Sequence, residues 1–345
     1  MPGARSKPYQ PYRDVHASPQ GAGDARPTGT QIVKDCDLVG KLKGKTILIT
    51  GANSGIGVTT AKALHLTGAK LFLTARDVSK LDKIIEEIVR ENPNLPVPEA
   101  IELHLNSLDS VRKAAKAIES KTATLDILIC NAGIMAVPYS LTEDGLESQI
   151  GVNHFAHFLL FQPLRPLMQK AAEKSKVPSR VVSVSSSGHW FSGGRFEDLH
   201  SKRHPMTYNK WQTYGQSKTA NIYMCNSITR HYASQGIIGL SLNPGVIATN
   251  LGRHLTESDH GDFSFTPELI NAFKTPEQGA ATTVWAALSP HFEDVENGGR
   301  YLADCGESEP TKPGAHAADT GYDPHAYDEE KEEKLWELSL KTVGL

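Results

Sequence analysis

Short aliphatic segments alternate with longer segments of mixed polarity along the middle of the chain. Uninterrupted aliphatic runs predict strands that are covered on both faces, as in a parallel sheet. The intervening segments 58–67, 78–91 and 108–120 place apolar residues at helical spacing. Strands are expected at 45–50, 70–75, 101–105, 125–130, 180–186, 236–242 and 299–303. This alternation predicts an α/β fold of the Rossmann type, with three layers doubly wound around a mostly parallel seven-stranded sheet.

The two ends of the chain differ from this middle. Residues 1–30 contain five prolines and several glycines but few large aliphatic residues, which predicts disorder. Segment 323–345 predicts a helix capped by Asp323, with a solvated charge run over 328–334 and an apolar docking face around Trp336. We therefore expect a largely disordered extension over 1–40, one Rossmann-type domain over 41–308, and a C-terminal extension with a docking helix over 309–345.

Composition and charge exclude several classes of protein. The 345 residues include 36 Lys and Arg against 39 Asp and Glu, so a net charge of −3 gives no polycationic surface for nucleic acid. No apolar run is long enough to span a membrane. The four cysteines lie far apart without a CxxC pair, which excludes a zinc ribbon or a disulfide scaffold and fits a reducing compartment. We expect a cytoplasmic protein without a metal site.

A glycine-rich turn, TGANSGIG at 50–57, joins the first strand to the first helix. Gly51 permits a tight turn, Gly55 lets a pyrophosphate approach the backbone, and Gly57 lets helix and strand pack closely. The free N–H groups at the helix N-terminus would face the anion. The alternative is an ordinary strand–helix turn. The pattern predicts a dinucleotide site whose candidate residues are Gly51, Asn53, Ser54, Gly55, Ile56 and Gly57.

The end of the second strand bears on the choice of cofactor. An acidic residue there would bind the ribose hydroxyls of NAD, whereas the guanidinium of Arg76 suits the 2′-phosphate of NADP. Ser54 could add a hydroxyl contact. Asp77 could point at a ribose or cap the next helix, and Arg76 could be an ordinary surface residue. We favour NADP(H) over NAD(H).

Tyr214 and Lys218 stand four residues apart, which places both on one face of a helix. A phenol titrates near pKa 10, and a neighbouring ammonium lowers that pKa. Tyr214 could then protonate a carbonyl oxygen as hydride arrives, or remove the alcohol proton in the reverse direction. Ser186 ends the fifth strand, where open α/β sheets place their ligands, and could hold the same oxygen; Ser185 is the next choice.

Six motifs occur in a characteristic order: TGANSGIG, CNAG at 130–133, Asn153 in GVNHFAHF, VSVSS ending at Ser186, YGQSK at 214–218 and NPGVIAT at 243–249. Over about residues 42–305 this set resembles the short-chain dehydrogenase/reductase family. Within it, the chain looks like a fungal member of the branch of retinol dehydrogenases and WW-domain oxidoreductases.

The resemblance implies a role for each matching residue. Tyr214 would be the catalytic acid/base, Lys218 would lower its pKa and hold the nicotinamide ribose, and Ser186 would steady the carbonyl. Asn153 would anchor a water in the proton relay to Lys218. Further cofactor contacts would come from Asn131, Ala132 and Gly133 beside the nucleotide, Ile247 and Thr249 at the carboxamide, and Asn106 near adenine. Asn106 replaces the usual Asp, and Cys130 replaces an Asn and is interpreted as packing.

The sequence therefore predicts an NADP(H)-dependent oxidoreductase that interconverts a ketone or aldehyde and an alcohol. The alternative is a non-catalytic NADP(H)-binding module. Substrate contacts are expected from loops 188–213 and 250–275. Aromatic residues in the first loop favour an apolar or ring-bearing small molecule, or else only pack that loop. A homodimer is possible through the helices that carry Tyr214 and Asn153.

Overall fold

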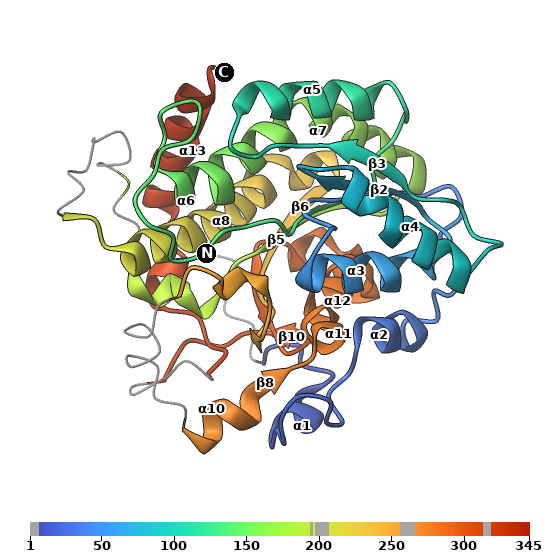
Figure 1. Cartoon of the computed structure of the whole chain (residues 1–345), viewed down its shortest axis with the longest axis horizontal. Coiled ribbons are helices and arrows are strands. Elements are labelled where there is room, and N and C mark those ends of the chain that lie inside the picture. Colours follow the sequence, from blue (N-terminus) through green and yellow to red (C-terminus); the bar gives the residue numbers. More distant parts are fainter. Residues whose placement is uncertain (1–6, 194–195, 197–206, 256–265, 313–318) are drawn as a thin grey trace.

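A parallel sheet with one short antiparallel edge strand forms the centre of the molecule (Figure 1). The computed structural model describes the whole chain except residues 1–6, 194–195, 197–206, 256–265 and 313–318. The sheet order is β10-β9-β6-β5-β4-β1-β2-β3, and only the pair β9–β10 is antiparallel. The strands are β1 (Thr46–Ile49), β2 (Lys70–Ala75), β3 (Glu99–Glu102), β4 (Ile127–Cys130), β5 (Ser179–Val184), β6 (Ile237–Asn243), β9 (Arg300–Ala303) and β10 (Gly306–Glu307). The predicted doubly wound α/β fold is confirmed.

The strand count of seven was one too low. The additional strand β10 contains only two residues and pairs back on β9 through a tight turn. Asp304 and Cys305 form that turn with φ values of 51° and 55°, in the left-handed region. Neither residue is a glycine, although Asp304 is of a type that tolerates this conformation.

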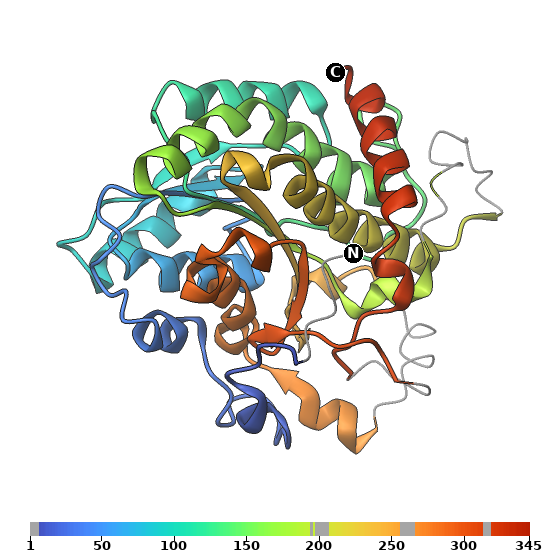
Figure 2. The same cartoon turned by 180° about the vertical axis from the view of Figure 1, so that it is seen from behind.

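Helices cover both faces of the sheet (Figures 1 and 2). One face carries α2 (Gly29–Asp35), α3 (Gly55–His65), α4 (Ser79–Glu91), α11 (Pro276–Gly279) and α12 (Ala281–Leu288). The other carries α5 (Leu108–Glu119), α7 (Ala156–Ser175), α8 (Lys210–Tyr232) and α13 (Glu329–Val343). Short elements complete the described chain: α1 (Arg13–His16), α6 (Ser148–Ile150), α10 (Pro267–Ala272), β7 (Val246–Ile247) and β8 (Phe273–Lys274). None of the described helices combines the length and apolar character needed to cross a membrane.

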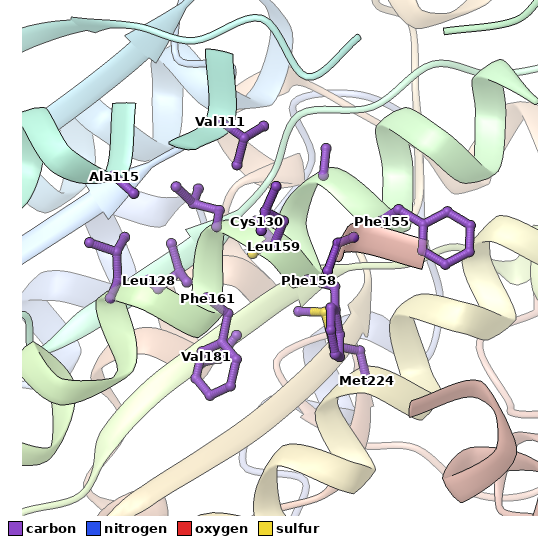
Figure 3. Packing of buried hydrophobic residues seen from close by; sticks show 14 of the residues in the cluster. Val111, Ala115, Leu128, Cys130, Phe155, Phe158, Leu159, Phe161, Val181 and Met224 are labelled. Carbon is purple, nitrogen blue, oxygen red and sulfur yellow. The ribbon is translucent and has the colours of Figure 1, made fainter. Parts of the chain in front are cut away.

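The core lies on both sides of the sheet because consecutive strand residues point to opposite faces. In β1, Leu48 packs into the cluster under α5 and α7, whereas Ile47 and Ile49 pack into the cluster under α3 and α12. Figure 3 shows the first cluster, in which Phe158 and Phe161 of α7 lie among residues of the sheet and of α8. This double burial explains the uninterrupted aliphatic strands.

The expectation of a largely disordered segment 1–40 is wrong for residues 7–40. Thr28 caps α2 by accepting a hydrogen bond from Gln31 N–H, and Ile32 and Val33 are fully buried. Arg26 is 5% exposed. The segment has few apolar residues, but these few dock between α3 and α12, and polar contacts to distant backbone hold the rest.

The C-terminal helix begins later than expected. Asp323 caps only a single 3-10 turn, Pro324–Ala326, while Asp328 caps α13 by accepting a hydrogen bond from Lys331 N–H at 3.1 Å. The supposed solvated charge run includes Glu332, which is 3% exposed and paired with Arg230. Docking of the helix is as expected, because the Trp336 ring packs against Phe158 of α7 with a centroid separation of 4.8 Å.

Candidate active site

The glycine turn after β1 packs closely against neighbouring segments of the protein because it lacks side chains. Gly51 has φ +67°, and a Cβ there would lie 2.8 Å from Ala132 Cβ. A Cβ on Gly57 would lie 2.3 Å from Gly51 O, so the helix could not approach the strand. Gly55 has φ +54°, which favours glycine. Ser54 is exposed at the N-terminus of α3 and makes no side-chain capping bond, so the first N–H groups of the helix are not capped by it.

The end of β4 is bound to this turn by Thr50. The Thr50 hydroxyl accepts hydrogen bonds from the backbone N–H groups of Asn131 and Ala132, both at 3.0 Å. Asn131 Nδ2 donates to Thr50 O at 2.9 Å, while Asn131 Oδ1 is buried without a partner among the described atoms. An unsatisfied buried acceptor beside a glycine cradle fits a bound dinucleotide with its own donors. The sequence had not indicated Thr50 as the organising residue.

At the end of β2, the structure shows different surroundings for Asp77 and Arg76, the two residues whose roles the sequence left open. Asp77 Oδ1 accepts hydrogen bonds from Ser79 Oγ at 2.6 Å and Ser79 N at 3.1 Å, so it is tied to the first residue of α4. The Ser79 hydroxyl lowers the pKa of Asp77. Arg76 is exposed and has no hydrogen bond or ion pair with any residue that the structure describes. Asn106 is half-buried after β3, and its backbone carbonyl accepts from Glu143 N–H at 3.0 Å.

Tyr214 and Ser186 meet at the carboxyl end of β5. Tyr214 on α8 is 3% exposed, and its ring lies beside Ser186: a Cβ added to Gly188 would be 2.6 Å from Tyr214 Cε1 and 3.3 Å from Ser186 Oγ. Burial raises the pKa of Tyr214 to about 12, although the Ser186 side chain acts in the opposite direction. Ser185, the second choice, instead donates its hydroxyl to Lys218 O at 2.8 Å and so fastens α8 to β5.

Lys218 lies behind Tyr214, as the four-residue spacing predicts. Its Nζ is 5.6 Å from the centroid of the Tyr214 ring and donates to Val184 O at 2.9 Å. Burial lowers the pKa of Lys218 to about 8. The expected lowering of the Tyr214 pKa by Lys218 is not seen in the protein alone, because desolvation of the phenol outweighs a cation at this distance.

Asn153 lies in a π-helical turn, Gly151–Phe155, that precedes α7. Its side chain exchanges two hydrogen bonds of 2.9 Å with the backbone of Ile134 and donates a third to Ser217 Oγ at 2.9 Å. Its backbone carbonyl accepts from His157 Nδ1 at 3.0 Å. A Cβ added to Gly133 would lie 3.1 Å from Asn153 Oδ1 and 3.5 Å from Lys218 Nζ. The structure thus brings Asn153, Gly133 and Lys218 together, with the Asn153 amide group already occupied.

Ile247 and Thr249 lie over the N-terminus of α3. A Cβ added to Gly279 would meet Ile247 Cγ1 at 2.7 Å and Ile56 Cγ2 at 2.9 Å, so these two side chains pack across that glycine. Thr249 lies beside Gly55, whose added Cβ would be 3.5 Å away, and its hydroxyl accepts from Leu251 N–H at 3.3 Å. The residues expected at a nicotinamide carboxamide therefore adjoin the glycine turn.

Two residues near Ser186 were missed by sequence reasoning. A Cβ on Gly188 would lie 2.6 Å from Tyr214 Cε1, so this glycine makes space for the phenol ring. His189 is fully buried and contacts the Ser186 carbonyl at 2.7 Å. The sequence offered only their position directly after Ser186 as a signal. Of the expected substrate loops, 194–195, 197–206 and 256–265 lie outside the described residues.

The interpretation of Cys130 as a packing residue is confirmed. Cys130 is buried in the core of the sheet. His154 is buried and hydrogen-bonded to Ser339 Oγ at 2.8 Å, which makes it structural. In the first loop, the Trp211 ring lies 6.5 Å from Tyr214 between ring centroids, while Phe196 packs against Tyr223 at 5.7 Å. The aromatic residues therefore divide between those that adjoin the site and those that fill the core.

The family model described as short chain dehydrogenase matches residues 45–260. The chain belongs to the short-chain dehydrogenase family. The short-chain dehydrogenase/reductase prx1 of Penicillium roqueforti is 42% identical over 340 residues, covering 97% of this chain and 95% of that protein. Human retinol dehydrogenase 14 is 39% identical over 323 residues, covering 89% and 88%. A solved protein from Mycobacterium paratuberculosis is 30% identical, with a TM-score of 0.66 and coverage of 90% and 97%.

These matches confirm the resemblance, including its fungal character and its likeness to retinol dehydrogenases. Members of the short-chain dehydrogenase family are oxidoreductases that bind nicotinamide cofactors. The glycine turn follows β1, Asn131 follows β4 and Ser186 follows β5, so all three lie at the carboxyl edge of the sheet.

Proposed function

We propose that the protein is an NADP(H)-dependent oxidoreductase that interconverts a ketone or aldehyde with an alcohol. The observation that carries this proposal is that Tyr214 and Ser186 lie side by side around Gly188, with Lys218 behind the Tyr214 ring, at the sheet edge that also holds the glycine turn. Open α/β sheets bind their ligands at this edge.

The chain's own groups supply the proton and hold the substrate oxygen. A bound nicotinamide would supply or accept the hydride. Because the Tyr214 pKa is raised to about 12, the phenol is protonated at neutral pH and can give its proton to the oxygen of a carbonyl under reduction. Lys218, with a pKa of about 8, is largely protonated at neutral pH, so it can stabilise the tyrosinate that remains. Ser186 would donate to the same oxygen.

Two observations support NADP(H) over NAD(H). Asp77 Oδ1 accepts two hydrogen bonds from Ser79, which ties this carboxylate to the start of α4 and favours a structural role over ribose binding. Arg76 extends from the end of β2 without a described partner, so its guanidinium can bind a 2′-phosphate bidentately.

The remaining features of the proposal concern substrate, location and assembly. Trp211 beside Tyr214 supports an apolar or ring-bearing small molecule, and the composition supports a cytoplasmic enzyme. A homodimer through α7 and α8 would have to accommodate α13, because Trp336 already packs on Phe158 of α7.

The test combines purified protein, NADPH and a panel of ketones and aldehydes, with Tyr214→Phe as the variant. We expect kcat to fall by about 10²–10⁴-fold while NADPH binding, followed by fluorescence, is unchanged. Tyr232→Phe is the matched control, because it removes another α8 hydroxyl, the one bonded to Arg165. Equal turnover by Tyr214→Phe and the parent would remove the assigned role. NADPH binding without turnover of any substrate would favour a non-catalytic binding module.

A further inference from the structure

The backbone of Ser186 is held by a neighbouring histidine. The Ser186 carbonyl oxygen accepts two hydrogen bonds from His189, one from the backbone N–H at 3.1 Å and one from ring Nδ1 at 2.7 Å. His189 is fully buried, so solvent does not reach its ring. The turn that presents Ser186 to Tyr214 is thus closed by one imidazole.

Two backbone groups define the tautomer of His189. The Ser186 carbonyl can only accept, so Nδ1 carries the proton. On the other side of the ring, Nε2 lies 3.1 Å from the backbone N–H of Asp323, which can only donate. His189 is therefore the neutral Nδ1–H form with both nitrogens bonded, and burial lowers its pKa to about 4.

The donor to Nε2 comes from the C-terminal extension, 134 residues further along the chain. This segment is fastened to the elements that carry Ser186 and Tyr214. Trp190 Nε1 donates to Gly321 O at 3.1 Å, and the Tyr223 hydroxyl of α8 donates to His325 O at 2.7 Å. The extension therefore bridges the serine turn and the tyrosine helix.

We propose that His189 is a positioning residue for Ser186, and that the C-terminal extension completes the active site by bonding His189 through the Asp323 amide. This inference rests on the proposed role of Ser186 in holding the substrate oxygen. The Ser186 hydroxyl accepts from Gly188 N–H at 3.0 Å, which leaves its own proton free to point at Tyr214. A rotation of the 186–189 turn would break that alignment.

A double-mutant cycle tests the link between His189 and Ser186. His189→Phe keeps a ring of similar size but removes both ring hydrogen bonds, whereas His189→Asn keeps a donor for the Ser186 carbonyl. We expect His189→Phe to lower kcat about tenfold without changing NADPH affinity, and His189→Asn to recover most of the loss. In a Ser186→Ala background, where kcat is already reduced, His189→Phe should change kcat less than about twofold, because its effect acts through the missing hydroxyl.

A second comparison isolates the Asp323 amide. Asp323 has φ −72° and ψ 142°, which proline can adopt, so Asp323→Pro removes the backbone N–H without straining the turn. Asp323→Ala removes only the side chain and keeps that N–H. We expect Asp323→Pro to have a kcat several-fold below that of Asp323→Ala.

Glu332→Ala is the control for general loosening of the extension, because it removes the contact with Arg230 without touching His189. It should lower the melting temperature and leave kcat unchanged. Equal kcat losses for His189→Phe in the parent and in the Ser186→Ala background, or equal kcat for Asp323→Pro and Asp323→Ala, would overturn the inference. A Ser186→Ala variant with unchanged kcat would instead remove the proposed role of Ser186 itself.

Discussion

Replacing Arg26 by alanine tests whether the N-terminal segment is an integral part of the fold. The Arg26 side chain is almost fully buried, and Nε donates to Asp24 Oδ1 at 2.8 Å. Its two terminal nitrogens donate to four backbone carbonyls, those of Gly21, Asn271, Ala272 and Phe273, at 2.6 to 3.2 Å. The substitution removes every one of these bonds and leaves buried acceptors behind.

The size of the effect follows from these contacts. A hydrogen bond to a charged group contributes roughly 1.5–3 kcal/mol, but the five bonds share one side chain and are not additive. Removing one partner of a buried ion pair costs about 3–5 kcal/mol. We expect Arg26→Ala to lower the free energy of unfolding by about 3–5 kcal/mol, a large part of the roughly 5–15 kcal/mol typical of a domain.

Urea unfolding followed by circular dichroism and tryptophan fluorescence measures this change. Arg13→Ala is the matched control, because Arg13 is an exposed arginine of the same segment and should change the free energy by less than about 0.5 kcal/mol. Arg26→Lys should be intermediate, since one ammonium cannot satisfy the same set of carbonyls. If Arg26→Ala matches Arg13→Ala, residues 7–40 do not contribute to stability and the reasoning is refuted.

Three further outcomes are expected. Gly188→Ala should lower kcat at least about tenfold, because its Cβ would meet the Tyr214 ring at 2.6 Å, whereas Gly193→Ala, with no neighbour closer than 3.9 Å, should not. Arg76→Ala should weaken NADPH by about 1.5–3 kcal/mol in fluorescence titrations and leave NADH unchanged; equal losses would argue against NADP. Burial opposes ionisation of Asp24, but hydrogen bonds from the Arg26 side chain and backbone amides lower its pKa from 3.8 to about 2. As the pH falls, Asp24 is therefore protonated in the unfolded state before it is protonated in the folded state. The stabilisation should be fully present above about pH 4 and should be lost as the pH falls towards about 2, which urea midpoints measure. The Asp24→Asn variant should not show this loss.

The strands and the glycine turn could be predicted because their signals are local. The predicted strand 70–75 matches β2 residue for residue. Gly51 has a positive φ, and a Cβ on Gly57 would clash with Gly51 O, as the motif predicts. Tyr214 and Lys218 share a helix face because the spacing itself fixes that relation.

The features that could not be predicted depend on contacts across the chain. Arg26 donates to the carbonyl of Ala272, which is 246 residues away, and no residue near Arg26 in the sequence indicates this partner. Asp323 and Asp328 each cap a helical turn, and nothing in the local sequence shows that the long helix starts after the second. Spacing shows that Lys218 is near Tyr214 but does not show how much water both residues lose, and desolvation sets the Tyr214 pKa.

The docking of α2 also bears on how fast the protein unfolds. Its first residue, Gly29, lies against Ala63 of α3 and Val284 of α12, so it joins parts of the chain that are far apart in sequence. Such distant pairings require closure of long stretches of chain, which costs entropy and slows their formation. Contacts that are absent from the folding transition state affect the unfolding rate alone, so the two rates measured for a variant at Gly29 would show on which side of the barrier α2 docks.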